Sequence, residues 1–161
     1  MKKTGAPREK KEPLRREVAR NAKAGFRFEI LETVEAGLVL LGSEVKALRE
    51  GKAQLQEAYA RFRGTELWLL KCHVPEYRQA AGANHEPMRP RKLLLHRHEM
   101  AKLHARVAQK GLTLVPLALY FNEEGRAKLE LALARGRKIY DKRDAIRARE
   151  AKADVRRASR R

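Results

Sequence analysis

The side chains best suited to metal chemistry gather in one short segment. His96, His98 and His104 lie close together, with Glu99 among them, and imidazole and carboxylate groups are ligands for zinc. A zinc protease motif places its second His four residues after the first, but Lys102 occupies that position after His98. The spacing therefore does not predict a metal centre, and we expect these histidines to be exposed polar groups on a helix.

Two further stretches resemble reactive motifs incompletely. Cys72 stands beside His73, but it follows an apolar strand pattern that favours a buried, inert thiol. Gly37 and Gly42 have the spacing of a phosphate-binding P-loop, but Ser43 stands where that motif needs a lysine. The sequence shows no convincing hydrolase arrangement, so we expect a protein that is not an enzyme and that needs no cofactor or metal.

The charge of the chain points to a polyanionic partner. The 161 residues include 38 Lys and Arg against 20 Asp and Glu, a formal net charge of +18. The excess lies mostly in the ends, because residues 1–27 carry a net +7 and residues 135–161 a net +8. A balance this basic favours nucleic acid first and an anionic membrane surface second.

Sequence features that would direct the protein to a membrane or out of the cell are not evident. The lysines near the N-terminus are not followed by an apolar run, so we expect no signal peptide. The apolar stretches are shorter than the roughly 20 residues that a membrane-spanning helix needs. The single cysteine cannot form an internal disulfide. We therefore expect a cytoplasmic protein.

The middle of the chain predicts strands with a few helices. Residues 26–42 alternate in polarity and break near Glu35, which indicates two tightly joined strands. Residues 58–70 and 112–134 each predict a hairpin, and Pro116 in the second marks an edge or a bulge. Ser43 is expected to cap a short helix, and residues 96–111 to form another. About six strands joined by short turns favour a small antiparallel barrel, mainly β with two to three flanking helices.

Three parts follow along the chain. Residues 1–20 are expected to be a flexible basic extension, residues 21–134 the barrel and residues 135–161 a basic tail. The polar loop 77–91 is punctuated by Gly and Pro and is expected to be mobile. In the tail, Asp141 is a good N-cap, but cations surround the helix axis and almost no apolar face exists. We expect this tail to be disordered alone and helical inside RNA, although a merely solubilising basic tail stays open.

Two clusters of cations lie inside the predicted barrel. Lys46, Arg49 and Lys52 surround the first short helix, and three more cations stand where the loop 77–91 re-enters a strand. Cations at such places bind phosphates, and each neutralised phosphate adds salt-sensitive affinity. Together with the two basic ends, these clusters predict RNA binding.

Four stretches together resemble the small protein B family, the SsrA-binding proteins of bacteria. They are EAGLVLLGSEVKALREGKA (35–53), EPMRPRKLLLH (86–96), KGLTLVPLALYF (110–121) and ARGRKIYDKRDAIRARE (134–150). The resemblance implies an oligonucleotide-binding-type (OB-fold-like) barrel without enzymatic activity that binds the tRNA-like domain of transfer-messenger RNA. It also implies that, with elongation factor Tu and GTP, the complex enters the A site of a stalled ribosome, where the tail occupies the empty mRNA channel. This process is trans-translation.

The resemblance assigns roles to individual positions. Asn21 and Lys23 match a basic N-terminal motif in which Ala22 replaces the usual first cation, and Glu35 and Leu94 match positions tied to the RNA. The expected transfer-messenger RNA contacts are Asn21, Lys23, Glu35, Lys46, Arg49, Lys52, Arg89, Arg91, Lys92 and Leu94. The expected contacts with the decoding centre and mRNA channel are Gly136, as a hinge, with Arg137, Lys138, Tyr140, Asp141, Lys142, Arg143, Ile146, Arg149 and Lys152.

A second interpretation stays open. The same residues would suit a general ribosome- or RNA-associated basic protein, such as a ribosomal protein with a permanently bound extension. A membrane binder is a more distant alternative, because the tail lacks the large apolar face of an interfacial helix.

Overall fold

The computed structural model describes residues 15–80, 82–109, 111–137 and 139–160, so the first 14 residues of the expected extension, and Lys138, lie outside the described residues. The strands are β1 (Arg16–Arg20), β2 (Phe28–Leu38), β3 (Tyr59–Arg63), β4 (Glu66–Leu70), β5 (Arg91–Leu94), β6 (Leu112–Phe121) and β7 (Ala127–Gly136). The helices are α1 (Ala24–Arg27), α2 (Gly42–Arg49), α3 (Arg97–Val107) and α4 (Ile139–Ala158).

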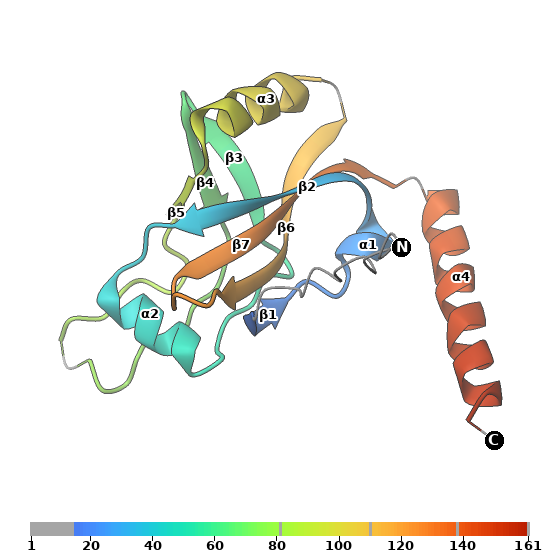
Figure 1. Cartoon of the computed structure of the whole chain (residues 1–161), viewed down its shortest axis with the longest axis horizontal. Helices are drawn as coiled ribbons and strands as arrows, with labels where there is room; N and C mark the ends of the chain where they lie inside the picture. The colour runs from blue at the N-terminus through green and yellow to red at the C-terminus, as the bar shows by residue number, and fades with distance from the viewer. Residues whose placement is uncertain (1–14, 81, 110, 138, 161) are drawn as a thin grey trace, which may run out of the picture.

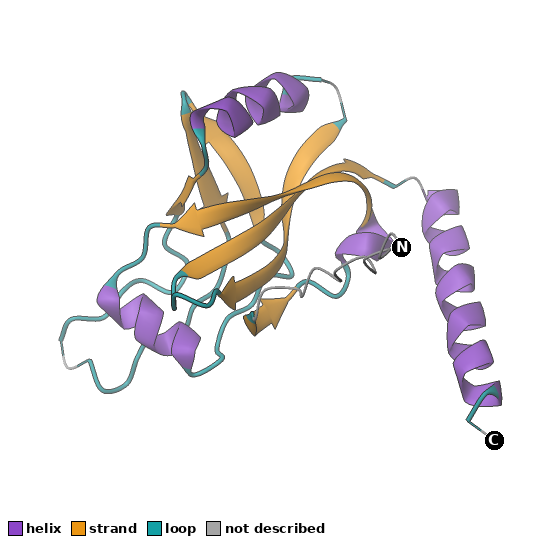
Figure 2. Cartoon of the chain, in the orientation of Figure 1, coloured by secondary structure: helices purple, strands orange, loops and turns teal. Residues whose placement is uncertain are grey.

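Six strands form a closed ring. The order is β6-β3-β4-β5-β2-β7, with β7 pairing back to β6, and every pairing is antiparallel. The helices surround this sheet, and α4 stands away from it at the C-terminal end (Figures 1 and 2). The predicted class, mainly antiparallel β with six strands closed on themselves and flanking helices, is confirmed.

The described residues contain more elements than the sequence predicted. Four helices are present where two to three were expected, and β1 adds a seventh strand beside β6. β1 falls within the segment 1–20, which we expected to be a flexible extension. Its five residues are all exposed or half-buried, so no buried apolar face marked it as a strand in the sequence.

Alternating leucines fill the ring. On β4, Leu67 and Leu69 are fully buried while their neighbours stay partly exposed, as the period of two along a strand requires. The other strands contribute side chains of the same kind to this core, namely Leu93, Leu114, Leu129, Leu131 and Leu133. This alternation of buried leucines can be recognised directly in the sequence.

One predicted break is wrong and one predicted bulge is confirmed. Residues 28–38 form a single strand, and Glu35, Ala36 and Gly37 continue the ladder with β7. The local turn signal of Gly37 is overridden by this pairing on both sides of β2. At Pro116, which cannot donate a ladder hydrogen bond, the register with β7 shifts as expected.

Helix α2 is held by a buried ion network. The carboxylate of Glu44 caps the helix by accepting from the Leu41 backbone N–H at 2.9 Å, and it also accepts from the guanidinium groups of Arg89 and Arg91. Glu44 and Arg91 are 0% and 1% exposed. Arg91 also donates to the Cys72 carbonyl oxygen at 2.6 Å, so the network joins α2 to β5 and to the segment before it.

The predicted cap of α2 is corrected by this geometry. Ser43 was expected to cap the helix, but Leu41 is the N-cap and the Glu44 side chain satisfies it. The Ser43 hydroxyl instead bonds Nδ1 of the buried His85 at 2.9 Å, and His85 Nε2 bonds the Val74 carbonyl at 2.9 Å. These contacts attach the loop 77–91 to α2, while its expected mobility stays a prediction.

Replacing Glu44 tests the network. Glu44→Gln keeps the shape but leaves two arginines without a counter-charge, and we expect a loss of about 3–5 kcal/mol in the free energy of unfolding. Chemical denaturation measures this loss. The matched control is Glu66→Gln, which removes the exposed pair with Lys92 and should cost less than about 1 kcal/mol. Equal effects of the two changes would contradict the assigned role of Glu44.

The Glu44 carboxylate should also make the stability of the protein depend on pH. Burial alone raises the pKa of Glu44, but hydrogen bonds from the Leu41 N–H, Arg89 and Arg91 outweigh it, and the net pKa lies below the usual 4.5. A lowered pKa in the folded state stabilises the protein at pH values above the unfolded pKa, and this contribution is lost as pH falls through the folded pKa. Below pH 4.5, the free energy of unfolding should therefore fall more steeply with decreasing pH for the native chain than for Glu44→Gln. Chemical denaturation at a series of pH values measures this difference.

Candidate nucleic-acid interface

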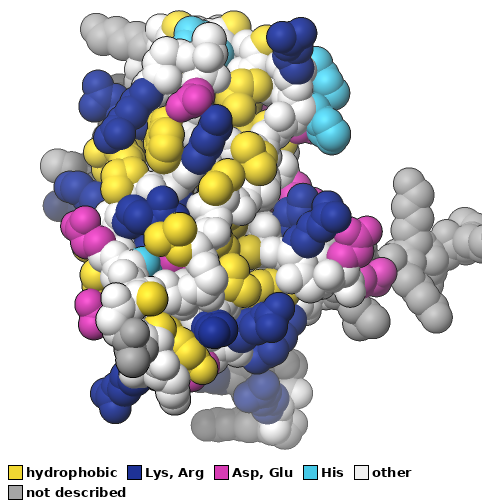
Figure 3. All heavy atoms as spheres, turned by 90° about the vertical axis from the view of Figure 1, so that its left-hand side faces the viewer, with side chains coloured by type: hydrophobic (Ala, Val, Ile, Leu, Met, Phe, Trp, Pro, Cys, Tyr) yellow, Lys and Arg dark blue, Asp and Glu magenta, His cyan; other side chains and the backbone are white. Residues whose placement is uncertain are grey.

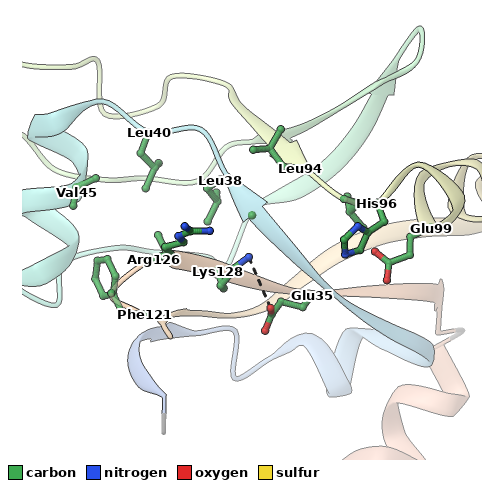
Figure 4. Close-up of a pocket in the computed structure, with 14 residues that line it drawn as sticks. Glu35, Leu38, Leu40, Val45, Leu94, His96, Glu99, Phe121, Arg126 and Lys128 are labelled. Carbon is green, nitrogen blue, oxygen red and sulfur yellow. Dashed lines mark ion pairs between the residues drawn. The ribbon is translucent and has the colours of Figure 1, made fainter. Parts of the chain in front are cut away.

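An open groove of about 650 Å³ brings two predicted RNA contacts together. Glu35 of β2 and Leu94 of β5 both line it. Leu38, Leu40 and Leu94 stand on one side of the groove, and Arg126 and Lys128 reach in from the β6–β7 side (Figure 4). Sequence reasoning did not identify these last two cations. The pairing of Gly37 with Lys128 places Lys128 there, and Arg126 stands just before the same strand. Such a register is not visible in the sequence.

Glu35 is held in one orientation. The buried Tyr120 hydroxyl donates to one carboxylate oxygen, and Lys128 Nζ lies 4.0 Å from the other. Burial, and then the hydrogen bond to Glu35, raises the pKa of Tyr120 to about 12, so the phenol stays a donor at neutral pH. The Glu35 side chain is nevertheless 55% exposed. It therefore presents a fixed acceptor that can receive a hydrogen bond from a base amino group or a sugar hydroxyl.

The start of the described chain packs against the Tyr120 ring. The Arg15 guanidinium lies 4.6 Å from the centre of the Tyr120 ring and 3.4 Å from a carboxylate oxygen of Glu130. β1 continues from this point along β6. The start of the described chain is thus part of the support for Glu35, which the sequence did not reveal.

Exposed apolar side chains lie among cations on this side of the molecule. Leu94 is 50% exposed, and Val39, Leu41 and Met88 are also well exposed. Figure 3 shows one side of the molecule, where apolar side chains lie between Lys and Arg side chains. Apolar surface between cations suits an unstacked base whose phosphates are neutralised nearby.

The cations of the first predicted cluster are accessible. Lys46, Arg49 and Lys52 are all exposed, at α2 or just beyond its end. Lys46 lies 5.6 Å from the centre of the Tyr77 ring, and Lys52 pairs with Glu50 at 3.2 Å. Such exposed contacts are weak in water, so these side chains can exchange them for phosphate.

The second predicted cluster is divided by burial. Arg91 is enclosed, and its guanidinium donates to Glu44, the Cys72 carbonyl and the Pro87 carbonyl. Its expected phosphate contact is therefore not accessible in this conformation, because its donors are already used inside the fold. Arg89 is 29% exposed and shares Glu44, while Lys92 faces outward and pairs with Glu66 at 3.0 Å.

The N-terminal motif has one structural and one exposed member. Asn21 donates from its amide side chain to the Pro116 carbonyl at 3.1 Å and from its backbone to the Leu117 carbonyl at 2.8 Å. It therefore fastens the β1–α1 turn to the bulge of β6. Lys23 precedes α1 and is exposed, which leaves its ammonium group available to a ligand.

The tail leaves the sheet at Gly136. This residue is paired with Phe28, its φ is not left-handed, and an added Cβ would meet open space, so this conformation does not require glycine. Arg137 Nε donates to the Phe28 carbonyl at 3.3 Å. Tyr140, Asp141 and Lys142 lie in the first turns of α4. Further along the helix, Arg143, Ile146, Arg149 and Lys152 are exposed.

The histidines singled out in the sequence lie apart from one another or contact other rings. Among the residues that the structure describes, no three His, Cys, Asp or Glu side chains are grouped to hold a metal ion. The His96 and His98 rings stack on each other at 5.8 Å, and His104 packs edge-on against Phe62 at 4.8 Å. No helix in the described ranges is long and apolar enough to cross a membrane.

Comparisons with known proteins agree on one family. The family model described as "SmpB protein" matches residues 18–161. The SsrA-binding protein of Agrobacterium fabrum is 54% identical over 145 residues, covering 90% of this chain and 91% of that protein. The SsrA-binding protein of Symbiobacterium thermophilum is 54% identical over 143 residues, covering 89% and 90%. A solved chain described as "tmRNA-SmpB: a journey to the center of the bacterial ribosome" is 49% identical with a TM-score of 0.65, covering 80% of this chain and 94% of that one.

Labelling of the Cys72 thiol tests whether this residue is buried and unreactive. Burial, opposed in part by the charge of Arg91, raises the pKa of Cys72 to about 11, and the side chain is 2% exposed. We expect a thiol reagent at pH 8 to label the folded protein far more slowly than the urea-unfolded chain, because the thiolate is the reactive form. Equal labelling rates in the two states would show that Cys72 is accessible after all.

Proposed function

The chain belongs to the SmpB protein family, and from this membership we propose that it binds transfer-messenger RNA and delivers it to stalled ribosomes in trans-translation. The observation that carries the proposal within the structure is the groove. It combines a fixed carboxylate acceptor at Glu35, exposed apolar surface at Leu94 and cations on its opposite side. Such a combination can distinguish one folded RNA from another, whereas cations alone cannot.

The ring of strands and the tail have separate tasks in this proposal. The ring, with the groove and the exposed cations of α2, binds the tRNA-like domain of the RNA. The tail then occupies the mRNA channel after the complex, with elongation factor Tu and GTP, enters the A site. Support comes from α4, whose exposed cations Arg143, Arg149 and Lys152 lie on a helix that stands clear of the sheet (Figure 1).

Absence of message can be detected by the same tail. An intact mRNA and the tail would compete for one path lined by ribosomal RNA. The structure describes most of the tail as the helix α4, and its disorder in the absence of RNA stays a prediction. The prediction rests on mutual repulsion of the cations, which destabilises the helix in water and which surrounding phosphates relieve. Folding of the tail is thereby linked to vacancy of the channel.

The proposal is of a binding protein rather than a catalyst, acting in the cytoplasm where ribosomes translate. The alternative is a general RNA-associated basic protein. A formal net charge of +18 supports that alternative equally well. The two proposals differ in whether one RNA is preferred over others of the same length.

A binding titration at several salt concentrations separates them. The RNAs are the tRNA-like domain of transfer-messenger RNA, a tRNA and an unrelated hairpin of matched length. The full chain is compared with a version ending at Arg137, because β7 is paired through Gly136 and Arg137 is bonded to Arg27. We expect both versions to prefer the tRNA-like domain, with a shallower salt dependence for the shorter one. Equal binding to all three RNAs would favour the general RNA binder.

The tail is tested on ribosomes. With the version ending at Arg137, we expect RNA binding to persist, while peptide tagging on ribosomes stalled at the end of a truncated message falls strongly. The control reaction uses a message that extends past the A site, on which the full chain should tag poorly. If the shortened chain tagged truncated messages as well as the full chain and kept the same selectivity, the tail would have no role in sensing the channel.

A further inference from the structure

The single tryptophan of the chain lies on the outer face of the sheet. On β4, Leu67 and Leu69 are 0% exposed and point into the ring. Alternation along the strand turns Trp68 to the opposite face, where it is only half-buried. Trp68 does not line the groove that contains Glu35. The role proposed for that groove therefore leaves this residue unexplained.

Cations from both neighbouring strands flank the indole. The strand register pairs Trp68 directly with Arg61 of β3 and with Lys92 of β5. Side chains directly opposite each other in antiparallel strands have Cβ atoms about 4.5–5.5 Å apart. The guanidinium carbon of Arg63 lies over the Trp68 ring, 5.8 Å from its centre, so a base that stacks on this face takes the place of Arg63. Three cations therefore surround one aromatic side chain.

The charge of this surface is not balanced within the protein. Glu66 pairs with Lys92 at 3.0 Å and lies opposite Arg63 in the register. In the described part of the chain, Arg61 and Arg63 form no ion pair within 4.0 Å. The exposed guanidinium group of Arg61 can therefore bind an anion, and that of Arg63 can do so by turning away from the Trp68 ring.

We propose that Trp68, Arg61, Arg63 and Lys92, here called the Trp68 platform, form a further RNA contact that stacks one unpaired base on the indole. Arg61 and Arg63 would bind the phosphates on either side of that base. Every base has an aromatic face, so such a site accepts single-stranded RNA without strong sequence preference. A duplex hides its base faces by internal stacking, so it cannot use the indole in this way.

The platform continues toward the groove. Lys92 and Leu94 are two residues apart on β5, so they face the same side of the sheet, and Leu94 lines the groove. A single strand stacked on Trp68 can therefore extend along β5 to Leu94. The inference goes beyond the proposed function, because it concerns unpaired nucleotides of any RNA rather than the identity of one RNA.

Fluorescence reports on this site directly, because the chain contains only one tryptophan. The full chain is titrated with a short oligouridylate and, separately, with a blunt RNA duplex of the same length, and binding of each is followed by the anisotropy of labelled RNA. We expect the single strand to quench Trp68 emission at saturation and the duplex to leave it unchanged. Single-strand binding without quenching, or equal quenching by both RNAs, would overturn the proposal.

Substitutions separate stacking from charge. Trp68→Leu should weaken single-strand binding roughly 5- to 150-fold, the equivalent of about 1–3 kcal/mol for one stacked base, whereas Trp68→Tyr should retain most of the affinity. Arg61→Gln and Arg63→Gln should each lower the salt slope by about 0.7. The matched control, Lys102→Gln, removes an exposed cation of α3 that pairs with Glu32 and should leave the slope unchanged.

Failure here can be distinguished from failure of the proposed function. The proposed platform would be contradicted if the native chain and Trp68→Leu bound the single strand with equal affinity while circular dichroism showed an intact fold. That result would leave the preference for the tRNA-like domain untouched. Loss of that preference in the native chain, with Trp68 quenching preserved, would have the opposite meaning.

Discussion

A carboxylate and a guanidinium share the interior of this protein, and three parts of the chain meet at them. Glu44 comes from α2 and Arg91 from β5, and Arg91 also holds the Cys72 carbonyl after β4. An unpaired charge in an apolar interior is costly, so these parts are stable only in one mutual arrangement. The outward neighbours on the same elements, Lys46 and Lys92, are thereby set at defined positions. A buried ion pair thus sets the positions of exposed cations on the same elements.

Two physical interactions could contribute to RNA recognition, namely long-range charge attraction and directional hydrogen bonding in the groove. The net charge of +18, concentrated at the two ends, attracts any polyanion and depends strongly on salt. The groove adds direction, because the Glu35 carboxylate is fixed by Tyr120 and accepts hydrogen bonds only from correctly placed donors. In the proposed function, long-range attraction brings RNA to the protein, and the groove would then select among the RNAs that arrive.

Much of the fold could be predicted because its signals are local. Alternating leucines, glycine turns and the bulge at Pro116 each act within a few residues, so both hairpins were predicted correctly. The continuity of β2 through Gly37 was missed, because β5 and β7 pair with it from distant parts of the sequence. The same limit hid Lys128, which reaches Glu35 only through the strand register.

The sequence by itself determined where charge gathers, which strands alternate and which family the chain resembles, since each depends on residue order alone. It could not determine what each arginine does. Arg91 lies two residues before the buried Leu93 and therefore faces the same side of β5, yet it was grouped with Lys92 as a phosphate contact. Only the tertiary structure shows that Arg91 is enclosed, because burial of a cation depends on a counter-charge that is far away in sequence. Glu44 supplies that charge, and folding is what brings the two together.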